Sequence, residues 1–423
     1  MLANRLRQAA NYILIIMNSP PTPHTTNHPR GHPTEFEQII NANSHNFIGR
    51  NFVFAAINEF IRRYQRGYFT IIGAPGSGKS AILAKYALDN PDVVYYNVEV
   101  AGKNRAEEFL KNICTQLIEM FTISLDNQPE NTTQGSWFLS LLLQQISDGL
   151  ASNQKLVIAI DGLNFIDRNS QSPGANLFYL PRYLPDGVYF LLSRRPFLPE
   201  KSGLLIEAPF QSLDLADYEA ENQADIQAYI QKYLTAEEIP PTPLQKGGSI
   251  SPHQSSNFLI DKEGNVPPFL RGARGDLKSW LSNHHISEQE FCTRLTTESE
   301  NNFMYLSQII NAIADNFYSE PFQYNQLPPG LETYYQQHLQ TIMPPEEHSE
   351  FKLAVLNELV KQQQPISAAA IAEILNTDEF EVEEVLENWL EFLQQEKNSD
   401  NTYYSLYHSH FRDWLSRQLS RSS

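Results

Sequence analysis

The chain of 423 residues is 41% hydrophobic and carries a formal net charge of −18 at pH 7. This length predicts two or three domains with cores of their own, and the acidic balance disfavours broad, non-specific binding to nucleic acid or to an anionic membrane. Cys114 and Cys292 lie far apart and outside any CxxC pattern, which disfavours a disulfide framework or a zinc site and fits a reducing compartment.

The N-terminal residues 1–44 are interpreted as a short helix followed by a linker. The apolar run Tyr12–Met17 is too short to span a bilayer and has no cleavage site after it, so we expect a cytoplasmic protein without membrane contact. Ser19–His32 is rich in proline and cannot bury much surface. Its histidines recur every four residues, at His24, His28 and His32. No acidic or cysteine partner accompanies them, so a flexible tail is preferred over a metal site.

From about residue 45 to residue 215, short apolar segments alternate with helical ones. The predicted strands are rich in Val, Ile and Tyr and cover Tyr68–Ile72, Val93–Val98, Lys155–Ile160, Val188–Leu192 and Leu204–Glu207. The predicted helices include Phe52–Tyr64, Lys79–Leu88, Asn104–Phe121 and Trp137–Leu150. Apolar strands that are separated by helices predict an α/β fold with a parallel sheet covered by helices.

A helical domain is predicted at residues 216–345. Helical segments at Asp217–Leu234 and Leu277–Ile313 flank an insertion at about 240–276, where Pro, Gly and Ser are frequent and no period is sustained. Such a composition indicates a disordered, solvated loop. Its basic residues would be the ones to contact a partner, and they are Lys246, Arg271 and Arg274.

A winged-helix domain is predicted at residues 346–423. Phe351–Gln362 is amphipathic, and Ser367–Leu375 reads as a short helix with a serine N-cap. After a turn, Val382–Gln394 has apolar residues at helical spacing, and Tyr403–Tyr407 reads as a strand. Two short helices about a tight turn, followed by a strand, are typical of a winged helix.

The segment after the first predicted strand carries the strongest chemical signal. Residues 73–80 read GAPGSGKS and fit the pattern G-x-x-x-x-G-K-[ST]. The glycines allow backbone N–H groups to close on phosphate oxygens, the lysine reaches the outer phosphates and the final serine ligates Mg²⁺. We therefore predict a site for ATP or ADP with Mg²⁺. Its residues in this segment are Gly73, Ala74, Pro75, Gly76, Ser77, Gly78, Lys79, Ser80 and Ala81.

A phosphate loop of this kind needs a second acidic group, because Mg²⁺ must also be held from a neighbouring strand. The strand Lys155–Ile160 is followed by Asp161, so Ser80 and Asp161 are the expected metal ligands. Hydrolysis further requires a group that orients or deprotonates water. Asn164 is a poor base and Asp167 lies further along the loop, so we expect slow turnover.

Four segments together resemble the STAND-class signal-transduction ATPases of the NACHT and apoptotic-ATPase kind, in their bacterial form. They are FIGR (Phe47–Arg50), GYFTIIGAPGSGKS (Gly67–Ser80), VIAIDGLNFID (Val157–Asp167) and YFLLSRRP (Tyr189–Pro196). The resemblance covers about residues 45–420 and implies a P-loop NTPase domain, a helical domain and a winged helix. The effector and repeat-sensor domains that are common in this class are not obvious in the chain.

The resemblance also implies roles for single residues. The backbone of Gly49 and Arg50 would lie near the adenine. Arg194 would sense the γ-phosphate, with Arg195 as the rival candidate. His408, in the segment YHSHFRDWL, would contact the β-phosphate of bound ADP and hold a closed state. The candidate catalytic residues are then Lys79, Asp161, Asn164, Asp167 and Arg194.

Two classes of function remain open from the sequence, and a metabolic kinase is disfavoured because no acceptor pocket or lid is evident. The first is a regulatory switch, in which ADP holds the domains together and ATP opens them for self-assembly or for contact with a separate effector or sensor protein. The alternative is a DNA-associated ATPase with a winged helix. Its recognition helix would carry acidic residues, which repel phosphate, so we expect no nucleic-acid partner. They are Glu383, Glu384, Glu387 and Glu391.

Overall fold

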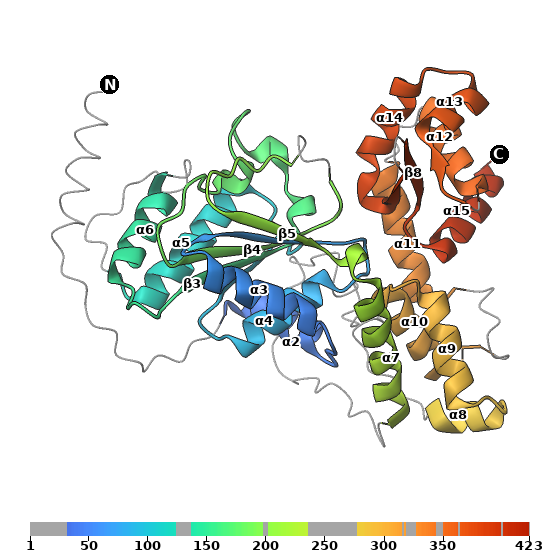
Figure 1. Cartoon of the computed structure of the whole chain (residues 1–423), viewed down its shortest axis with the longest axis horizontal. Coiled ribbons are helices and arrows are strands. Elements are labelled where there is room, and N and C mark those ends of the chain that lie inside the picture. The colour runs from blue at the N-terminus through green and yellow to red at the C-terminus, as the bar shows by residue number, and fades with distance from the viewer. Residues whose placement is uncertain are drawn as a thin grey trace, which may run out of the picture.

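The computed structural model describes residues 32–123, 137–197, 202–235, 277–314, 317–318, 327–343, 350–362, 364–398 and 401–422. Helices and strands of the N-terminal half are α2 (Thr34–Ser44), α3 (Asn51–Arg63), β1 (Gly67–Ile72), α4 (Lys79–Asp89), β2 (Val94–Asn97), α5 (Ala106–Phe121), α6 (Trp137–Gly149), β3 (Leu156–Asp161), β4 (Val188–Arg194) and β5 (Phe210–Asp214). Figure 1 shows them as one body, beside which the rest of the chain lies.

The remaining elements are helical apart from three short strands. They are α7 (Glu219–Thr235), α8 (Leu277–Asn283), α9 (Glu288–Ser299), α10 (Phe303–Ala314), α11 (Pro329–Ile342), α12 (Glu350–Lys361), β6 (Ile366–Ser367), α13 (Ala368–Leu375), α14 (Glu379–Asn388), β7 (Leu393–Asn398), β8 (Asn401–Leu406) and α15 (Ser409–Ser422). In Figure 1, α7 to α10 form the lower right part and α11 to α15 the upper right part. Among the described helices, none has the length and apolarity needed to cross a membrane.

The N-terminal body is built on a parallel sheet with strand order β2-β3-β4-β1-β5. Every residue of β3 and β4 is buried, because both strands lie inside the sheet and are covered on both faces. Helices α2, α3 and α4 lie together below the sheet in Figure 1, and α5 and α6 lie toward its β3 side. The predicted α/β fold, a parallel sheet surrounded by helices, is therefore confirmed.

The fifth strand lies later in the chain than predicted. Leu204–Glu207 is extended but joins no sheet; Leu205 N instead donates to Asn176 Oδ1 at 2.7 Å, and Glu207 N donates to the carbonyl of Arg182 at 2.9 Å. The observed strand β5 lies at an edge and pairs only with β1. Its first three residues are exposed, so it lacks the continuous apolar run by which the other strands were recognised.

Two hydrophobic cores divide the chain. The first includes Phe36 and Ile40 of α2 and extends to Leu215, so residues 34–44 pack with the sheet although they were predicted to belong to the linker. The second runs from Ile226 to Leu415 and includes both the helical and the C-terminal part. The predicted N-terminal helix, the insertion with its three basic residues, His24 and His28 lie outside the described residues.

The helical region after the insertion is divided into three helices rather than one continuous segment. Turns with positive φ at His285, Glu300 and Asn301 separate α8, α9 and α10. Ser287 caps α9, where its Oγ accepts a hydrogen bond from Glu290 N at 3.1 Å. The turn between α9 and α10 positions Asn302 directly before α10.

The C-terminal part has two short helices, α13 and α14, beside an antiparallel sheet of strand order β6-β8-β7. Ser367 caps α13 as predicted, since its Oγ accepts from Ala370 N at 3.2 Å. The predicted helix Val382–Gln394 is wrong at its end: α14 stops at Asn388, and Leu393 begins β7. Buried apolar residues continue through the turn after α14, so the apolar pattern predicted a longer helix than the structure contains. The winged-helix assignment stays a prediction.

Candidate nucleotide-binding site

The loop between β1 and α4 requires its glycines. Gly76 and Gly78 have φ values of 80° and 92°, which residues with a Cβ rarely adopt. A Cβ on Gly73 would lie 2.6 Å from Ser77 Oγ, and a Cβ on Gly76 would lie 2.2 Å from Asn302 Oδ1. Ser77 Oγ is buried without a hydrogen-bond partner in the described part of the chain. A glycine loop that leads into a helix N-terminus is suited to phosphate, and an unpartnered hydroxyl there fits such a ligand.

Lys79 is folded against the same loop. Its Nζ donates hydrogen bonds to the carbonyl oxygens of Gly73 at 2.7 Å and of Ala74 at 2.9 Å. Burial, and then the positive charge of Arg195, lower the pKa of this ammonium to about 7, while nearby carboxylates including Asp161 raise it. An anionic ligand would favour the charged lysine, as expected of a group that binds phosphate.

Asp161 ends β3 and is 1% exposed. It accepts hydrogen bonds from Ser193 Oγ, from Asn97 Nδ2 at 3.1 Å and from Tyr95 OH at 3.4 Å. Burial raises its pKa, and hydrogen bonds from Ser193 and Ser80 oppose this shift. Ser80 and Asp161, the two residues expected to hold Mg²⁺, are therefore neighbours, and their hydroxyl and carboxylate oxygens suit a hard cation.

The loop after β3 does not bring a second carboxylate to Asp161. Asn164 lies half-buried in the short 3-10 turn Leu163–Phe165. Asp167 caps the next turn: its Oδ1 accepts from Asn169 N at 3.0 Å, and its own N–H donates to the carbonyl of Asn104 at 2.9 Å. The carboxylate of Asp167 is thus engaged in holding the loop.

The two arginines at the end of β4 face different surroundings. The guanidinium of Arg194 donates to the carbonyl of Ser202 at 3.3 Å and lies 3.5 Å from the ring centre of Phe197. Ser193, one position before Arg194, donates a hydrogen bond to Asp161, and the guanidinium of Arg195 lies 4.9 Å from the ring centre of Phe165, in the turn after β3. Of the two arginines, Arg195 is therefore the one whose charge acts on Lys79, and the role of Arg194 as γ-phosphate sensor stays a prediction.

Glu99 also belongs to the candidate nucleotide site, although it was not predicted from the sequence. It follows β2 and interacts electrostatically with Asp161, Arg195 and Lys79. Its side chain remains accessible to solvent, yet desolvation by the surrounding protein, and then the charge of Asp161, raise its pKa. An acid at the end of an apolar predicted strand was the signal that could have found it.

Arg50 joins the phosphate loop to α7. It is 2% exposed, and its guanidinium donates to the carbonyl of Ser77 at 2.7 Å and to Asn222 Oδ1. Its backbone N–H donates to Asp225 Oδ2 at 2.9 Å. The preceding Gly49 has a φ of 72°, and a Cβ there would lie 2.0 Å from Asp225 Oδ1. The proximity of Gly49 and Arg50 to an adenine stays a prediction, whereas their contact with α7 is part of this structure.

The start of α10 also contacts the phosphate loop. Asn302 Nδ2 donates to the carbonyl of Pro75 at 3.1 Å, and Met304 N donates to the carbonyl of Gly76 at 3.2 Å. Asn302 is 6% exposed, and its Oδ1 accepts from Tyr305 N at 2.9 Å, which caps the helix. One side chain therefore serves both the helix start and the phosphate loop.

His408 is not directed at the phosphate loop. Its Nε2 lies 3.2 Å from the carbonyl of Ser299, and its Nδ1 accepts from His410 N at 3.1 Å, so the protein engages both ring nitrogens. In this structure His408 holds the end of α9 to the start of α15, and its contact with the β-phosphate of a bound ADP stays a prediction. The charges of Arg195 and Lys79 act instead on His338 of α11, where burial is the largest cause of a lowered pKa.

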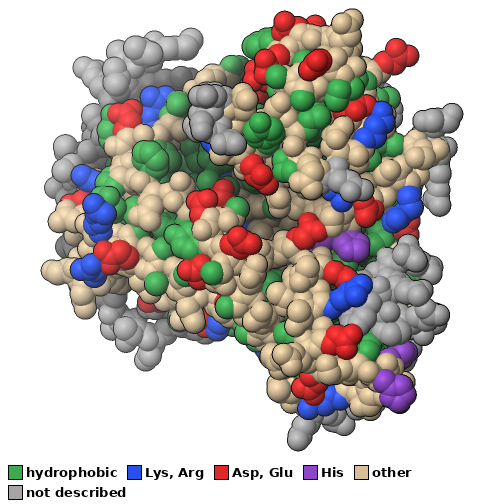
Figure 2. Space-filling model, turned by 45° about the vertical axis from the view of Figure 1, so that its right-hand side comes forward, with side chains coloured by type: hydrophobic (Ala, Val, Ile, Leu, Met, Phe, Trp, Pro, Cys, Tyr) green, Lys and Arg blue, Asp and Glu red, His purple; other side chains and the backbone are tan. Residues whose placement is uncertain are grey.

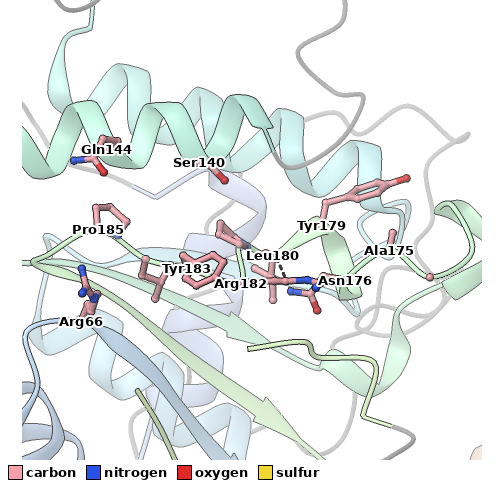
Figure 3. Close-up of a pocket in the computed structure, with 13 residues that line it drawn as sticks. Arg66, Ser140, Gln144, Ala175, Asn176, Tyr179, Leu180, Arg182, Tyr183 and Pro185 are labelled. Atoms are coloured by element: carbon pink, nitrogen blue, oxygen red, sulfur yellow. Dashed lines mark hydrogen bonds between the residues drawn. The ribbon is translucent and has the colours of Figure 1, made fainter. Parts of the chain in front are cut away.

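A separate cavity of about 670 Å³ lies between α6 and residues 174–185. Figure 3 shows Ser140 and Gln144 of α6 on one side of it and Tyr183 and Arg182 on the other. Its lining residues precede the amino ends of β1 and β4, whereas the phosphate loop follows the carboxyl end of β1. Ligands of open α/β sheets bind at the carboxyl ends of the strands, so this cavity is not the nucleotide site.

No protein-family model and no curated protein matches the sequence. Among solved structures, a signal transduction ATPase with numerous domains (STAND) with a tetratricopeptide repeat sensor, from Pyrococcus horikoshii, aligns at TM-score 0.33 and 14% identity over 87% of this chain and 42% of that one. Drosophila ORC bound to DNA aligns at TM-score 0.34 and 13% identity over 91% and 98% of the two chains. The RuvB Holliday junction branch migration motor of Thermotoga maritima aligns at TM-score 0.32 and 11% identity over 87% and 96%.

These likenesses are too distant to carry an argument about function. The chain spans less than half of the length of the Pyrococcus horikoshii protein. What the chain itself offers is a glycine loop between a strand and a helix, a lysine on that loop, and a hydroxyl beside a buried carboxylate. These groups fit a nucleoside phosphate with a divalent cation. No group of three or more His, Cys, Asp or Glu side chains able to hold a metal occurs in the described ranges.

Proposed function

We propose that this protein is a P-loop ATPase that acts as a nucleotide-dependent switch. ATP or ADP, with Mg²⁺, binds at Gly73–Ser80 and controls whether the helical and C-terminal parts stay closed on the phosphate loop. Three site features support the nucleotide: the positive φ values of the glycines, the fold of Lys79 onto the loop and the proximity of the Ser80 hydroxyl to Asp161, whose pKa it lowers.

One observation carries the switch: three consecutive carbonyls of the phosphate loop accept hydrogen bonds from groups tied to the second core. Pro75 accepts from Asn302, Gly76 from the backbone of Met304, and Ser77 from Arg50, which is bonded to α7 in turn. Phosphates bind to the N–H groups of such a loop, so nucleotide and helical part hold the same few residues. A change in the bound nucleotide therefore changes the stability of the contact with the helical part, and a change in that contact changes the affinity for nucleotide.

Roles for the remaining site residues follow from their positions. Lys79 would bind the outer phosphates, and Ser80 and Asp161 would hold Mg²⁺, which would neutralise part of the negative charge of the phosphates. Arg195 takes over the role of γ-phosphate sensor that the resemblance gave to Arg194, because its charge reaches Lys79 and Glu99. It also lies 5.1 Å from the ring centre of Phe392, in the C-terminal part.

The switch requires a difference in nucleotide affinity between the closed and open states. Moving the population from one state at about 1% to about 99% requires a difference of about 10⁴-fold in affinity. The guanidinium of Arg195 lies 4.9 Å from the ring centre of Phe165 and 5.1 Å from that of Phe392. A γ-phosphate that binds Arg195 would therefore change the contact of this side chain with the two rings. The third phosphate is therefore the part of the ligand that distinguishes the two states.

The proposed partners are further copies of this chain, or a separate effector or sensor protein. Figure 2 shows a face that is hollowed between the parts of the molecule, with Asp and Glu side chains on both sides of the hollow. The second candidate, a DNA-associated ATPase, would place α14 or its neighbours on phosphates. Helix α14 has no Lys or Arg and exposes glutamates, which disfavours that contact. Those glutamates are Glu379, Glu381, Glu383 and Glu384.

The test is size-exclusion chromatography with light scattering on protein without nucleotide, with ADP and with a non-hydrolysable ATP analogue. Retained nucleotide is identified after denaturation. The switch predicts retained ADP on a small species that changes mass or shape with the ATP analogue, and Lys79→Ala should lose both the nucleotide and the change. Identical elution in every nucleotide state would argue against the switch, and binding of duplex DNA with a steep salt dependence would favour the second candidate.

A further inference from the structure

Glu99 lies where strand β2 leaves the sheet next to Asp161. Strands β2 and β3 are neighbours, and Asn97, the last residue of β2, pairs in register with Asp161, the last residue of β3. The next residue, Val98, donates its backbone N–H to the carbonyl of Asp161 at 3.0 Å. The chain at Glu99 therefore leaves the sheet at the same edge as the expected metal ligand.

Asn97 fixes the position of Glu99 relative to that ligand. Its Oδ1 accepts the backbone N–H of Glu99 at 2.8 Å, and its Nδ2 donates to Asp161 Oδ2 at 3.1 Å. Because Asn97 is only 4% exposed, this bridge is shielded from competing water. The backbone of Glu99 and the carboxylate of Asp161 are thus held by two ends of one amide group.

The side chain of Glu99 passes over Gly162, the residue after Asp161. A Cβ built on Gly162 would lie 3.3 Å from Glu99 Cγ and 3.5 Å from Glu99 Oε1. Gly162 has a φ of 80°, which favours glycine at this position. Lys79 and Arg195 act electrostatically on the Glu99 carboxylate, and water reaches it. A second carboxylate therefore stands beside the metal and phosphate ligands, although none follows Asp161 in the loop.

We propose that Glu99 is the catalytic carboxylate that orients and deprotonates the water that attacks ATP. This inference rests on the proposed function. The water oxygen forms the new bond to the γ-phosphorus, and the electron pair of the broken P–O bond leaves on the terminal oxygen of ADP. The proton of the water passes to the carboxylate of Glu99 and then to solvent, so that the products are ADP, phosphate and one proton. Glu99 replaces Asn164 and Asp167 as candidates, and it removes the reason to expect slow turnover.

The experiment compares Glu99→Gln with the parent and with Glu107→Gln, an exposed glutamate on α5. Each protein is incubated with ATP and Mg²⁺, and two quantities are measured: the affinity for a fluorescent ATP, and the identity of the nucleotide recovered after denaturation. We expect Glu99→Gln to bind ATP within a few-fold of the parent, to hydrolyse it about 10²- to 10⁴-fold more slowly, and to retain ATP where the parent retains ADP. Glu107→Gln should behave as the parent does.

Other outcomes overturn the inference in different ways. If Glu99→Gln hydrolyses ATP as fast as the parent does and likewise retains ADP, Glu99 is not the base and the ATPase assignment survives. If Glu99→Gln and Glu99→Ala both remain folded but no longer bind nucleotide, the carboxylate serves binding rather than water activation. If the parent and Glu107→Gln bind no nucleotide at all, the proposed function fails and the role of Glu99 fails with it.

Discussion

Asn302→Ser would separate the two tasks of Asn302. Serine accepts a hydrogen bond at a helix N-cap about as well as asparagine does, so the contact with Tyr305 N, now at 2.9 Å, can be replaced. The donor that reaches the carbonyl of Pro75 at 3.1 Å is lost. The substitution therefore weakens the contact between the helical part and the phosphate loop while it leaves α10 capped.

The magnitude follows from burial. Pro75 is buried and Asn302 is 6% exposed, so water replaces the missing donor only when the parts open. An unsatisfied buried carbonyl costs about 1–3 kcal/mol, which corresponds to about 5- to 150-fold in the equilibrium between closed and open states. If ADP stabilises the closed state, its affinity should fall by a factor in this range, because the coupling between two equilibria is reciprocal.

Hydrogen exchange with mass spectrometry, together with the release rate of a fluorescent ADP, measures the effect. In the presence of ADP, Asn302→Ser should raise exchange in residues 73–80 and 299–306 and should speed ADP release. Ser287→Ala removes a comparable cap from α9, at an exposed position away from the phosphate loop, and should change neither. Equal exchange and equal ADP release in the parent and in Asn302→Ser would refute the coupling through Asn302.

Two further predictions concern charge. Arg195→Ala should reduce the preference for an ATP analogue over ADP by about 10- to 150-fold, the loss expected for a charge-assisted hydrogen bond of about 1.5–3 kcal/mol. Arg194→Ala should not, because its guanidinium contacts Ser202 and Phe197; calorimetric titration that gave the reverse order would restore Arg194. Burial lowers the pKa of His408 to about 4, although the negative charge of Glu300 raises it in part. Because the pKa of this histidine is higher in the unfolded chain, the unfolded chain binds more protons than the folded one as the pH falls below about 6.5. The free energy of unfolding should therefore fall as the pH falls from 6.5 to 4, by at most about 1.4 kcal/mol per unit from this group, and His408→Gln should show a flatter dependence in urea titrations.

The parts of the site that local sequence determines were predictable. The glycine loop, Lys79 and Ser80 belong to one short segment, and Asp161 was recognised because an apolar strand ends in an acid. Ser80 lies close enough to Asp161 to lower the pKa of its carboxyl group. The parallel sheet followed from alternating apolar and helical segments. The edge strand β5 was not predicted, because only one side of it is covered and its sequence is correspondingly polar.

The residues that depend on strand order or on contacts between the two cores were not predictable from one sequence. Glu99 meets Asp161 because β2 and β3 are neighbours, and apolar patterns do not give the order of strands. Asn302 lies 227 positions from Pro75, and no local pattern joins them. The choice of Arg195 over Arg194 depends on the contacts of the two side chains, since Arg194 contacts Ser202 and Phe197 whereas Arg195 lies against Phe165.

The distance between the two cores in each nucleotide state is the most direct test of the switch. Spin labels at Lys111→Cys on α5 and Glu384→Cys on α14, both exposed positions, would report it by pulsed electron paramagnetic resonance, with Cys114 and Cys292 replaced. We predict one narrow distance distribution with ADP and a longer or broader one with an ATP analogue. The same distribution with ADP, with the ATP analogue and without nucleotide would contradict the proposal that nucleotide controls the closure of this protein.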